Sequence, residues 1–330
     1  MAISCTASGP AGSDQAVVFA CDRRYLPYAL FAAARLAALH PARRFDICLC
    51  SLDEDLVVPA SLAGLGLRVC RIDTGGVLSG LRLDARRTEA AYLRLALPAA
   101  LGADYRRLLY LDSDVFPQGG DWEALLGLDL GGRAIGAVRD NLQWRSPGRR
   151  PEVFRKLGLG AAPYFNSGLL LIDVAAFRQQ RVLERSLAVA AQHGDRMVGL
   201  DQELLNAVLH GDWAELSPLW NWQYTRSSML FEAMETAHLV HFIGGKKPWT
   251  HTGGALPPKF RAAYAAFLAR HLPEAAPGQA ALPVHRNRRY LWSMLFRHLR
   301  GAGRTCDYLE RFPTDLTVVS DPAVPAGQPG

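Results

Sequence analysis

The chain reads Leu108-Leu109-Tyr110-Leu111-Asp112-Ser113-Asp114-Val115 at the point that decides its fold. An apolar run that ends in two carboxylates is typical of a buried strand leading into a loop, and ligands of α/β proteins bind beyond such strand ends. Asp112 and Asp114 leave an extended backbone on the same face, where they would repel each other unless a divalent cation lies between them. Oxygen ligands favour Mg²⁺ or Mn²⁺. A purely structural capping role for both aspartates stays open.

Composition restricts the class of protein. Of the 330 residues 49% are hydrophobic, which excludes wholesale disorder and allows one large α/β domain with or without an appendage. Six scattered cysteines without a Cys-x-x-Cys pair indicate a reduced cytosolic protein, and neither a secretory signal nor a membrane-spanning run is visible. The net charge of +6 is modest and no base-reading module is apparent, so we expect no nucleic-acid partner.

The first hundred residues predict a nucleotide-binding sheet. Apolar segments at 16–20, 45–50 and 67–72 are strands, and 27–39 is a helix that Pro27 begins. This order favours parallel strands joined by right-handed crossovers. Neither Gly-x-Gly-x-x-Gly nor a P-loop motif occurs, which disfavours dinucleotide-binding and P-loop enzymes.

Four separated motifs then occur in one order: residues 17–22 (Val-Val-Phe-Ala-Cys-Asp), 109–114 (Leu-Tyr-Leu-Asp-Ser-Asp), 165–168 (Phe-Asn-Ser-Gly) and 241–249 (His-x-x-Gly-x-x-Lys-Pro-Trp). With Leu200-Asp201-Gln202, the set resembles the eighth family of glycosyltransferases, which includes bacterial lipopolysaccharide galactosyl- and glucosyltransferases and glycogenin. The resemblance covers residues 15–270. It implies a single GT-A domain, an α/β nucleotide-diphospho-sugar transferase fold, with Mn²⁺ dependence (Mg²⁺ as the second choice), a UDP-sugar donor and retention at the anomeric carbon.

The resemblance assigns the metal and nucleotide ends of the site. Asp112, Asp114 and His241 match the metal ligands; alone, His241 would favour a local hydrogen bond at a strand end. Lys247 matches the diphosphate contact, and Gly244 lets the backbone approach it. The remaining residues that the resemblance places at the nucleotide are Ala20, Asp22 at the uracil edge, Tyr25 stacked on the base, and Ser113. A capping Asp22 and a core Tyr25 are the alternatives, and Arg23-Arg24 departs from the family pattern at the ribose contact.

The sugar end of the site is assigned in the same way. The residues matched there are Asn166, Ser167 and Gly168 in a loop lining the sugar pocket, Asp201 at the sugar hydroxyls, Arg94 near the sugar and the first metal-binding aspartate, and Gln202 beneath the anomeric carbon. Arg94 could instead extend to water. The catalytic set is Gln202, Asp201 and Arg94. An amide is a poor nucleophile, so we favour front-face attack, with Asp201 and Glu203 kept as alternative nucleophiles.

The end of the chain forms a separate unit in this prediction. We expect a GT-A domain at 15–270, a linker and basic amphipathic helical tail at 271–312, and disorder at 313–330. Six arginines and no acid lie between Arg286 and Arg304, and positions 291, 294, 295, 298 and 299 share one helical face. Such a helix suits the anionic inner membrane surface. A helix packed on the domain with its arginines in solvent is the alternative.

The sequence therefore predicts a retaining, Mn²⁺-dependent hexosyltransferase. It would move galactose or glucose from UDP-galactose or UDP-glucose to a glycan or glycolipid acceptor of lipopolysaccharide type. We expect it in the cytoplasm, peripheral to the inner membrane. A glycogenin-like self-glucosylating enzyme and a non-catalytic UDP-sugar-binding protein are the alternatives.

Overall fold

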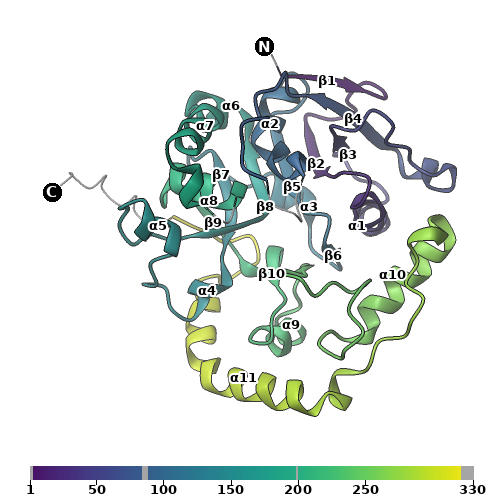
Figure 1. Cartoon of the computed structure of the whole chain (residues 1–330), viewed down its shortest axis with the longest axis vertical. Helices are drawn as coiled ribbons and strands as arrows, with labels where there is room; N and C mark the ends of the chain where they lie inside the picture. The colour runs from purple at the N-terminus through teal and green to yellow at the C-terminus, as the bar shows by residue number, and fades with distance from the viewer. Residues whose placement is uncertain (1–2, 84–87, 198–199, 321–330) are drawn as a thin grey trace.

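The computed structural model describes residues 3–83, 88–197 and 200–320, which form a large mixed sheet covered by helices on both faces (Figure 1). The large sheet has nine strands in the order β1-β4-β3-β2-β5-β8-β7-β9-β12, and a small sheet has the order β10-β11-β6. The strands are β1 (Ser4–Ala7), β2 (Gln15–Ala20), β3 (Asp46–Ser51), β4 (Leu67–Asp73), β5 (Arg107–Leu111), β6 (Val115–Pro117), β7 (Ile135–Arg139), β8 (Phe165–Asp173), β9 (Ala214–Leu216), β10 (Trp222–Gln223), β11 (Leu239–His241) and β12 (Val318–Val319).

The helices pack on both faces of the large sheet and below it. The α-helices are α1 (Leu26–Leu39), α2 (Leu93–Ala100), α3 (Trp122–Leu126), α4 (Asn141–Trp144), α5 (Glu152–Lys156), α6 (Val174–Gln179), α7 (Val182–His193), α8 (Leu200–Leu209), α9 (Met229–Glu235), α10 (Pro258–His271) and α11 (Arg288–Leu309). Short 3₁₀ segments lie at Ala60–Leu65, Glu89–Tyr92, Gly194–Arg196, Pro218–Asn221, Pro273–Ala275 and Val284–Arg286.

The central strands are parallel where the sequence predicts a crossover sheet. β2 pairs in parallel with β3 and β5, and β3 pairs in parallel with β4. β2, β3 and β5 are buried on both faces after their first residue, as expected of strands covered by helices on each side, whereas β4 is only partly buried and includes Arg68 and Arg71. The sheet as a whole is mixed, because β8 runs antiparallel to both β5 and β7.

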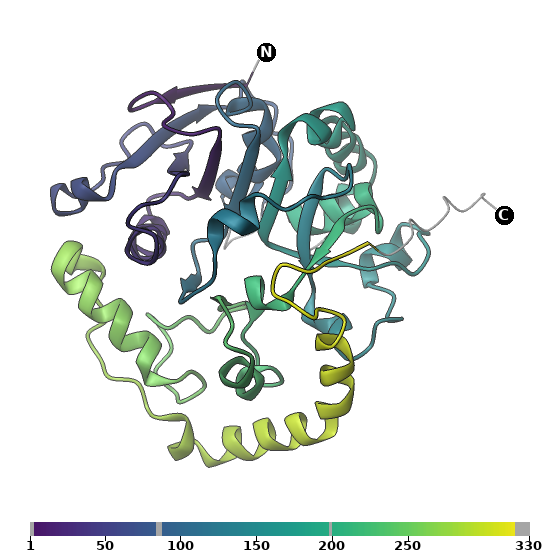
Figure 2. The same ribbon diagram turned by 180° about the vertical axis from the view of Figure 1, so that it is seen from behind.

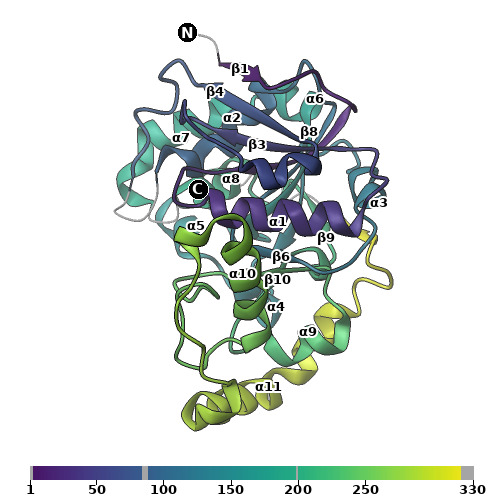
Figure 3. The same ribbon diagram turned by 90° about the vertical axis from the view of Figure 1, so that its right-hand side faces the viewer.

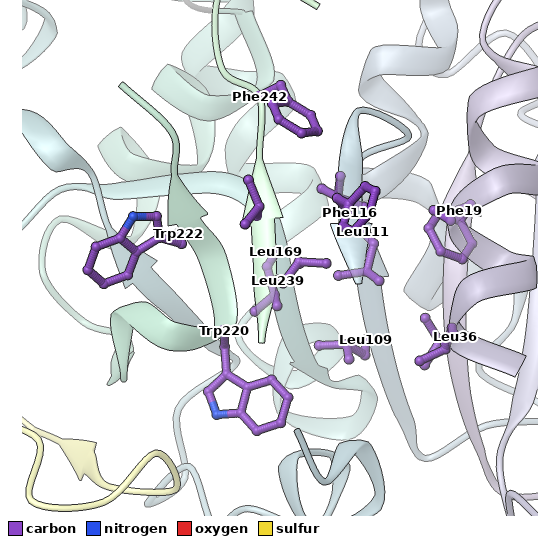
Figure 4. Close-up of a cluster of buried hydrophobic side chains, with 14 of the residues drawn as sticks. Phe19, Leu36, Leu109, Leu111, Phe116, Leu169, Trp220, Trp222, Leu239 and Phe242 are labelled. Carbon is purple, nitrogen blue, oxygen red and sulfur yellow. The ribbon is translucent and has the colours of Figure 1, made fainter. Parts of the chain in front are cut away.

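Two apolar clusters occupy the two faces of the large sheet. One lies under α1, α3 and α10, and it extends from Phe19 in β2 to Phe116 in the small sheet and to Trp220 just before β10 (Figure 4). The other lies under α2, α6, α7 and α8. Figure 3 shows α1 and α2 on opposite sides of the sheet. The end of β5 and the start of β6, which flank Asp112 and Asp114, are therefore held in position by close-packed apolar side chains.

The basic tail packs on the domain. Figure 2 shows α11 as a long helix at the edge of the molecule away from the large sheet, in contact with α4. Met294 and His298 are buried against the domain and Leu291 and Leu295 are partly buried. Leu299, which the sequence placed on the same face, is 81% exposed. The alternative of a packed helix is therefore confirmed, while the assignment of Leu299 to its apolar face is wrong.

The predicted disorder at 313–330 is wrong for residues 313–320. Val318–Val319 form β12, which pairs antiparallel with β9 at the edge of the large sheet. Trp220 Nε1 donates a 2.8 Å hydrogen bond to the carbonyl oxygen of Asp315. Composition suggested a free end, but backbone and side-chain partners on the domain fix this segment. Residues 321–330 lie outside the described residues. No helix in the described ranges is long and apolar enough to cross a membrane.

Candidate active site

Two aspartates and a histidine form a compact cluster at the end of β5. Asp112 follows β5, Asp114 precedes β6, and His241 ends β11. His241 Nε2 lies 3.6 Å from Asp112 Oδ2 and 3.2 Å from Asp114 Oδ1. One ligand atom from each residue lies within 4.8 Å of the other two. The structure thus brings together the three residues that the sequence predicts as metal ligands, and two carboxylates with an imidazole are a chemically suitable set for Mn²⁺.

Sheet register and a glycine place the histidine beside the aspartates. β11 pairs antiparallel with β6 so that His241 lies opposite Val115. Gly168 in β8 lies against the imidazole, and a Cβ atom there would be 2.2 Å from His241 Cε1. Only glycine leaves room for the ring in this position. The structure also places Asn166, Ser167 and Gly168 in strand β8 and not in a loop, which corrects the prediction from sequence.

An asparagine that the sequence analysis did not identify orients His241. His241 Nδ1 lies 2.9 Å from Asn221 Oδ1, and because an amide oxygen only accepts, Nδ1 carries a proton and donates. This arrangement directs Nε2 toward the two carboxylates. The amide of Asn221 is fixed in turn, since its Nδ2 donates a 2.9 Å bond to Asn166 Oδ1. Partners of this kind set the tautomer and direction of a ligating histidine.

Lys247 brings a positive charge to the cluster. Its Nζ donates to Asp114 Oδ2 and to the carbonyl oxygen of Phe242. Burial by itself would raise the pKa of Asp114, but the adjacent Lys247 and His241 hold that pKa well below its usual range. Asp114 is therefore a carboxylate at neutral pH. Gly244, at the turn between β11 and Lys247, has φ +73°, a conformation that a residue with a Cβ atom rarely adopts.

Arg94 is a buried cation that ties three parts of the site together. Its side chain is 6% exposed, so the alternative that it extends to water is wrong. Its guanidinium donates to Asp112 Oδ1 at 2.9 Å and to Ser167 Oγ at 2.8 Å, and Nε lies 3.1 Å from Asp201 Oδ2. Its carbon Cζ also lies 4.4 Å from the centre of the Tyr110 ring. Burial disfavours its charge, but Asp112 and Asp201 raise the pKa of Arg94 above its usual value.

The amide of Gln202 is held from both ends. Its Oε1 accepts hydrogen bonds from Asn166 Nδ2 at 3.2 Å and from the Ser167 backbone N–H at 3.1 Å. Its Nε2 donates to Tyr164 Oη at 3.3 Å and to Asp140 Oδ2 at 3.5 Å. The orientation of the amide is therefore fixed within the cluster of predicted sugar-site residues.

Asp140 is a second residue that the sequence analysis missed. It follows β7 and caps α4, where its Oδ1 accepts from the Leu142 backbone N–H at 3.0 Å. It is 8% exposed, and burial raises the pKa of its carboxyl group above the usual value. The signal in the sequence is its position directly after the apolar segment that forms β7, at a strand end where ligands of α/β proteins bind.

The predicted nucleotide contacts lie near the ends of β2 and β3. A cavity of about 410 Å³ there is lined by residues that include Asp22, Ser51, Asp53 and Thr88. Asp22 Oδ1 accepts from the Tyr25 backbone N–H at 3.0 Å, which is the local capping role left open from sequence, and Oδ2 accepts from Thr88 Oγ1 at 3.0 Å. Ser51, Asp53 and Thr88 were not predicted as site residues, although the sequence places Ser51 and Asp53 directly after the second strand.

Two further details concern the predicted nucleotide contacts. Tyr25 is half-buried, and burial, together with the charge of Asp114, raises the pKa of its hydroxyl. The unusual Arg23 turns outward, with its guanidinium 2.7 Å from Asp55 Oδ2 in an exposed ion pair.

Ser113 and Ala20 complete the predicted donor-binding set. Ala20 ends β2 and is 8% exposed. Ser113 lies between the two aspartates and is 6% exposed, and its Oγ has no hydrogen-bond partner among the described residues. A buried hydroxyl without a partner is costly in a folded protein, and a bound ligand is one way to satisfy it. Asp112, Asp114 and His241 therefore fit a bound cation, and Ser113 fits a ligand with hydrogen-bond acceptors, such as a diphosphate.

Comparison with known families agrees with this geometry. The model of the family described as glycosyl transferase family 8 matches residues 16–253. This chain belongs to glycosyltransferase family 8. The match includes β2, both metal-cluster aspartates, Gln202 and His241, and it leaves α10 and α11 outside.

Two curated relatives each match about half of the chain. General stress protein A of Bacillus subtilis is 32% identical over 177 residues, which cover 49% of this chain and 59% of that protein. Lipopolysaccharide 1,2-glucosyltransferase of Escherichia coli is 30% identical over 175 residues, covering 49% of each. The chain thus spans about half the length of the curated relatives that it matches.

Solved structures share the fold over a longer range. A crystal structure of the galactosyltransferase LgtC with donor and acceptor sugar analogues has a TM-score of 0.63 and 23% identity, covering 78% of this chain and 96% of that chain. The apo-form glycosyltransferase GlyE of Streptococcus pneumoniae has a TM-score of 0.53 and 18% identity, covering 81% of this chain and 65% of that chain. The fold of this protein is therefore the GT-A fold of these enzymes.

Proposed function

We propose that this protein is a retaining hexosyltransferase that moves galactose or glucose from UDP-galactose or UDP-glucose to a glycan or glycolipid acceptor. The observation that carries the proposal is the convergence of Asp112, Asp114, His241 and Lys247. Arg94 joins this group to Ser167 and Asp201 beside the fixed Gln202 amide. Family membership supports a sugar transferase, and the name of the lipopolysaccharide 1,2-glucosyltransferase supports a hexose and a lipopolysaccharide-type acceptor.

Asp112, Asp114 and His241 would hold Mn²⁺, with Mg²⁺ as the second choice. The imidazole biases this ligand set toward Mn²⁺, because Mg²⁺ prefers oxygen ligands alone. When bound, the cation supplies Lewis-acid neutralisation of negative charge on a diphosphate. Asn221 keeps the Nε2 lone pair of His241 directed toward the cation site.

The donor would extend from the cavity at Asp22 to the cluster at Asp114. Asp22 and Tyr25 would bind the uracil base, and Lys247 would contact the diphosphate. As the sugar–phosphate bond breaks, negative charge develops on the leaving UDP, and the Lys247 ammonium stabilises that charge. Ser113 Oγ, which lacks a hydrogen-bond partner among the described residues, would donate a hydrogen bond to the UDP-sugar.

The sugar would lie over Gln202, with Asp201 and Arg94 beside it. Gln202 Oε1 already accepts three hydrogen bonds, from Asn166 Nδ2 and from the backbone N–H and Oγ of Ser167, which lowers its electron density and disfavours it as a nucleophile. The Asp201 carboxylate is engaged by Arg94 and by Ser167 Oγ. These contacts support front-face attack, in which the acceptor hydroxyl enters on the side from which UDP leaves. The dipole of the fixed amide would stabilise the positive charge that develops on the sugar.

The acceptor would be presented at the inner membrane surface, where the protein acts as a peripheral cytoplasmic enzyme. α11 carries an exposed apolar stripe of Trp292, Phe296 and Leu299, which are 69%, 61% and 81% exposed. Their spacing of four and three residues places them on one face of the helix. The surrounding arginines favour an anionic leaflet, each by about 1 kcal/mol. This stripe replaces the face predicted from sequence as the membrane-binding surface.

Turnover of a labelled donor tests the proposed function. We expect the purified protein with Mn²⁺ to release UDP slowly from UDP-galactose or UDP-glucose, and Asp114→Asn to reduce that release below detection while far-UV circular dichroism stays unchanged. Loss of one metal-binding carboxylate accounts for the effect. UDP binding without turnover of any UDP-hexose would favour a non-catalytic sugar-nucleotide-binding protein. Full activity of Asp114→Asn would show that the metal assignment is wrong.

A further inference from the structure

A second pocket lies between α11 and the loop that follows α4. Its volume is about 630 Å³. Four of its lining residues are arginines, at positions 145, 149, 304 and 311, and the acid in its lining is Asp307. Trp144 and Tyr308 belong to its wall. None of these residues is part of the donor site, so the function proposed above leaves the pocket unexplained.

Two of the four arginines are available to a ligand. Arg145 donates to Thr305 Oγ1 at 2.9 Å and to the carbonyl oxygen of Ser227, and Arg311 pairs with Glu215 at 3.1 Å. Arg149 and Arg304 are exposed, and no hydrogen bond or ion pair joins either side chain to a residue in the described part of the chain. Two unpaired guanidinium groups in one pocket attract an anion with several oxygen atoms.

The wall of the pocket is rigid. The rings of Trp144 and Tyr308 stack with centres 5.6 Å apart and an interplanar angle of 16°. Trp144 Nε1 donates to the Arg139 carbonyl oxygen at 2.7 Å, and Tyr308 Oη donates to Glu215 Oε1 at 3.0 Å. Both rings are almost completely buried. A ligand would therefore meet a preformed surface, which reduces the entropic cost of binding.

Helix α4 connects the wall of the pocket to a residue that contacts Gln202. Asp140, which contacts Gln202, caps the single turn of helix that ends at Trp144 in the pocket wall. One helical turn is about 5.4 Å long. The positive charge of Arg149 is also close enough to lower the pKa of Asp140, against the larger effect of burial. An anion in the pocket would thus lie beside Trp144, at the other end of the helical turn that Asp140 caps.

We propose that Arg149 and Arg304 bind a phosphate monoester on the acceptor saccharide, close to the sugar that receives the hexose. This assignment rests on the function proposed above and narrows its acceptor to phosphorylated glycans. The guanidinium forks would contact the phosphate oxygens, and the stacked rings of Trp144 and Tyr308 would form the back of the site. The pocket would position the acceptor for transfer, and it would have no part in cleavage of the donor.

The test compares two acceptors that differ only in phosphate. One is the oligosaccharide of deacylated lipopolysaccharide with its phosphates intact, and the other is the same oligosaccharide after their removal with hydrofluoric acid. For the wild type, we expect kcat/KM to be at least about tenfold higher for the phosphorylated form, as two charge-assisted contacts would give. The double variant Arg149→Gln/Arg304→Gln should lose this preference while donor hydrolysis without acceptor stays unchanged.

Controls separate the pocket from general charge effects. Arg300→Gln removes an exposed arginine of α11 that does not line the pocket, so it should keep the full preference. Thermal unfolding of each variant checks that exposed substitutions leave the fold intact. Calorimetric titration of the wild type with inorganic phosphate alone should give much weaker binding than titration with the phosphorylated oligosaccharide.

Three outcomes would overturn the assignment. The wild type could treat both oligosaccharides alike, the double variant could keep the preference, or inorganic phosphate could bind as tightly as the oligosaccharide, which would make the pocket a site for a free anion. If no UDP-hexose is turned over, the proposed function fails. The calorimetric comparison of wild type and double variant still decides whether the pocket binds the phosphorylated saccharide.

Discussion

At the scale of single residues, the close approach of His241 to Asp112 and Asp114 depends on a glycine at position 168. Gly168 leaves space for the His241 ring, and a Cβ atom there would overlap Cε1 at 2.2 Å. The His241 ring has little freedom to move away from such a Cβ atom, because Nδ1 is hydrogen-bonded to Asn221 and the backbone is fixed by strand pairing. A methyl group at position 168 would therefore displace Nε2 from the two carboxylates.

We predict that Gly168→Ala weakens Mn²⁺ binding by at least about tenfold, the effect typical of altered support of a metal ligand. The free Mn²⁺ signal in electron paramagnetic resonance, titrated with protein and UDP, measures the affinity. Gly160→Ala is the matched control, since a Cβ atom there meets no heavy atom within 4 Å. Binding by Gly168→Ala as tight as that of the wild type would contradict the role assigned to His241.

Asp140 makes a residue-scale prediction about pH. Burial raises the pKa of its carboxyl group in the folded state above the unfolded value of about 3.9. The folded state then binds its proton more tightly, so this group's contribution to stability falls as pH rises from the unfolded to the folded pKa. Asp140→Asn removes this loss and keeps a residue that can cap α4.

We therefore expect the difference in melting temperature, Asp140→Asn minus wild type, to become more positive as the pH rises above about 4. Differential scanning calorimetry at several pH values measures the difference. The same substitution at the exposed Asp129 is the control. A difference between variant and wild type that does not change with pH would show that the proton on Asp140 is not linked to folding.

At the scale of elements, α11 has two faces with different partners. Met294, His298 and Tyr308 pack on the domain, whereas Trp292, Phe296 and Leu299 face solvent. Exposed aromatic residues at helical spacing among arginines are typical of a helix that lies in a membrane interface. In the proposed membrane-bound form, the helix would contact the bilayer through this face while it stays packed on the domain.

We predict that Trp292→Ser/Phe296→Ser reduces co-sedimentation with phosphatidylserine vesicles by at least about tenfold, because burial of each aromatic side chain contributes about 1.5–3 kcal/mol. Binding of the wild type should also fall as salt rises. Val57→Ser removes another exposed apolar side chain, 71% exposed and distant in sequence from α11, and should have no effect. Equal sedimentation of the double variant and the wild type would refute membrane docking through this face.

At the scale of the whole molecule, the chain returns to the large sheet after α11. β12 adds to β9, and Asp315 joins two parts of the small-sheet region through the Trp220 N–H and His238 Nε2, at 2.8 and 2.9 Å. The N-terminal sheet, the metal cluster and the basic helix are thereby held in one framework. A molecule that ended after α11 would leave the buried Trp220 donor without its partner.

We predict that truncation after Phe312 lowers the free energy of unfolding by about 1–3 kcal/mol, the cost of leaving a buried donor unsatisfied. Urea denaturation followed by tryptophan fluorescence measures it. Asp315→Ala keeps the backbone carbonyl that Trp220 uses and removes only the His238 contact, so its effect should be smaller. A truncated protein as stable as the full chain would show that this segment does not brace the domain.

The sequence by itself determined the elements and the ends of the central strands. Apolar runs predicted β2, β3 and β5, because a strand buried on both faces is largely hydrophobic, and β4 was predicted from its alternating apolar residues. The ordered motifs carried the family resemblance, and that resemblance predicted the residues that meet in the site, including Arg94 and Gln202. These signals are local, so they survive without knowledge of the fold.

Only the tertiary structure showed which residues from distant segments support the site residues. Asn221, Asp140 and the pocket at Arg149 and Arg304 depend on contacts between segments far apart in the chain, and no local pattern encodes such contacts. The same holds for the end of the chain, where composition predicted disorder but pairing with β9 produces a strand. The face of α11 that meets solvent was likewise set by packing on the domain, because helical periodicity defines faces but not which of them the domain covers.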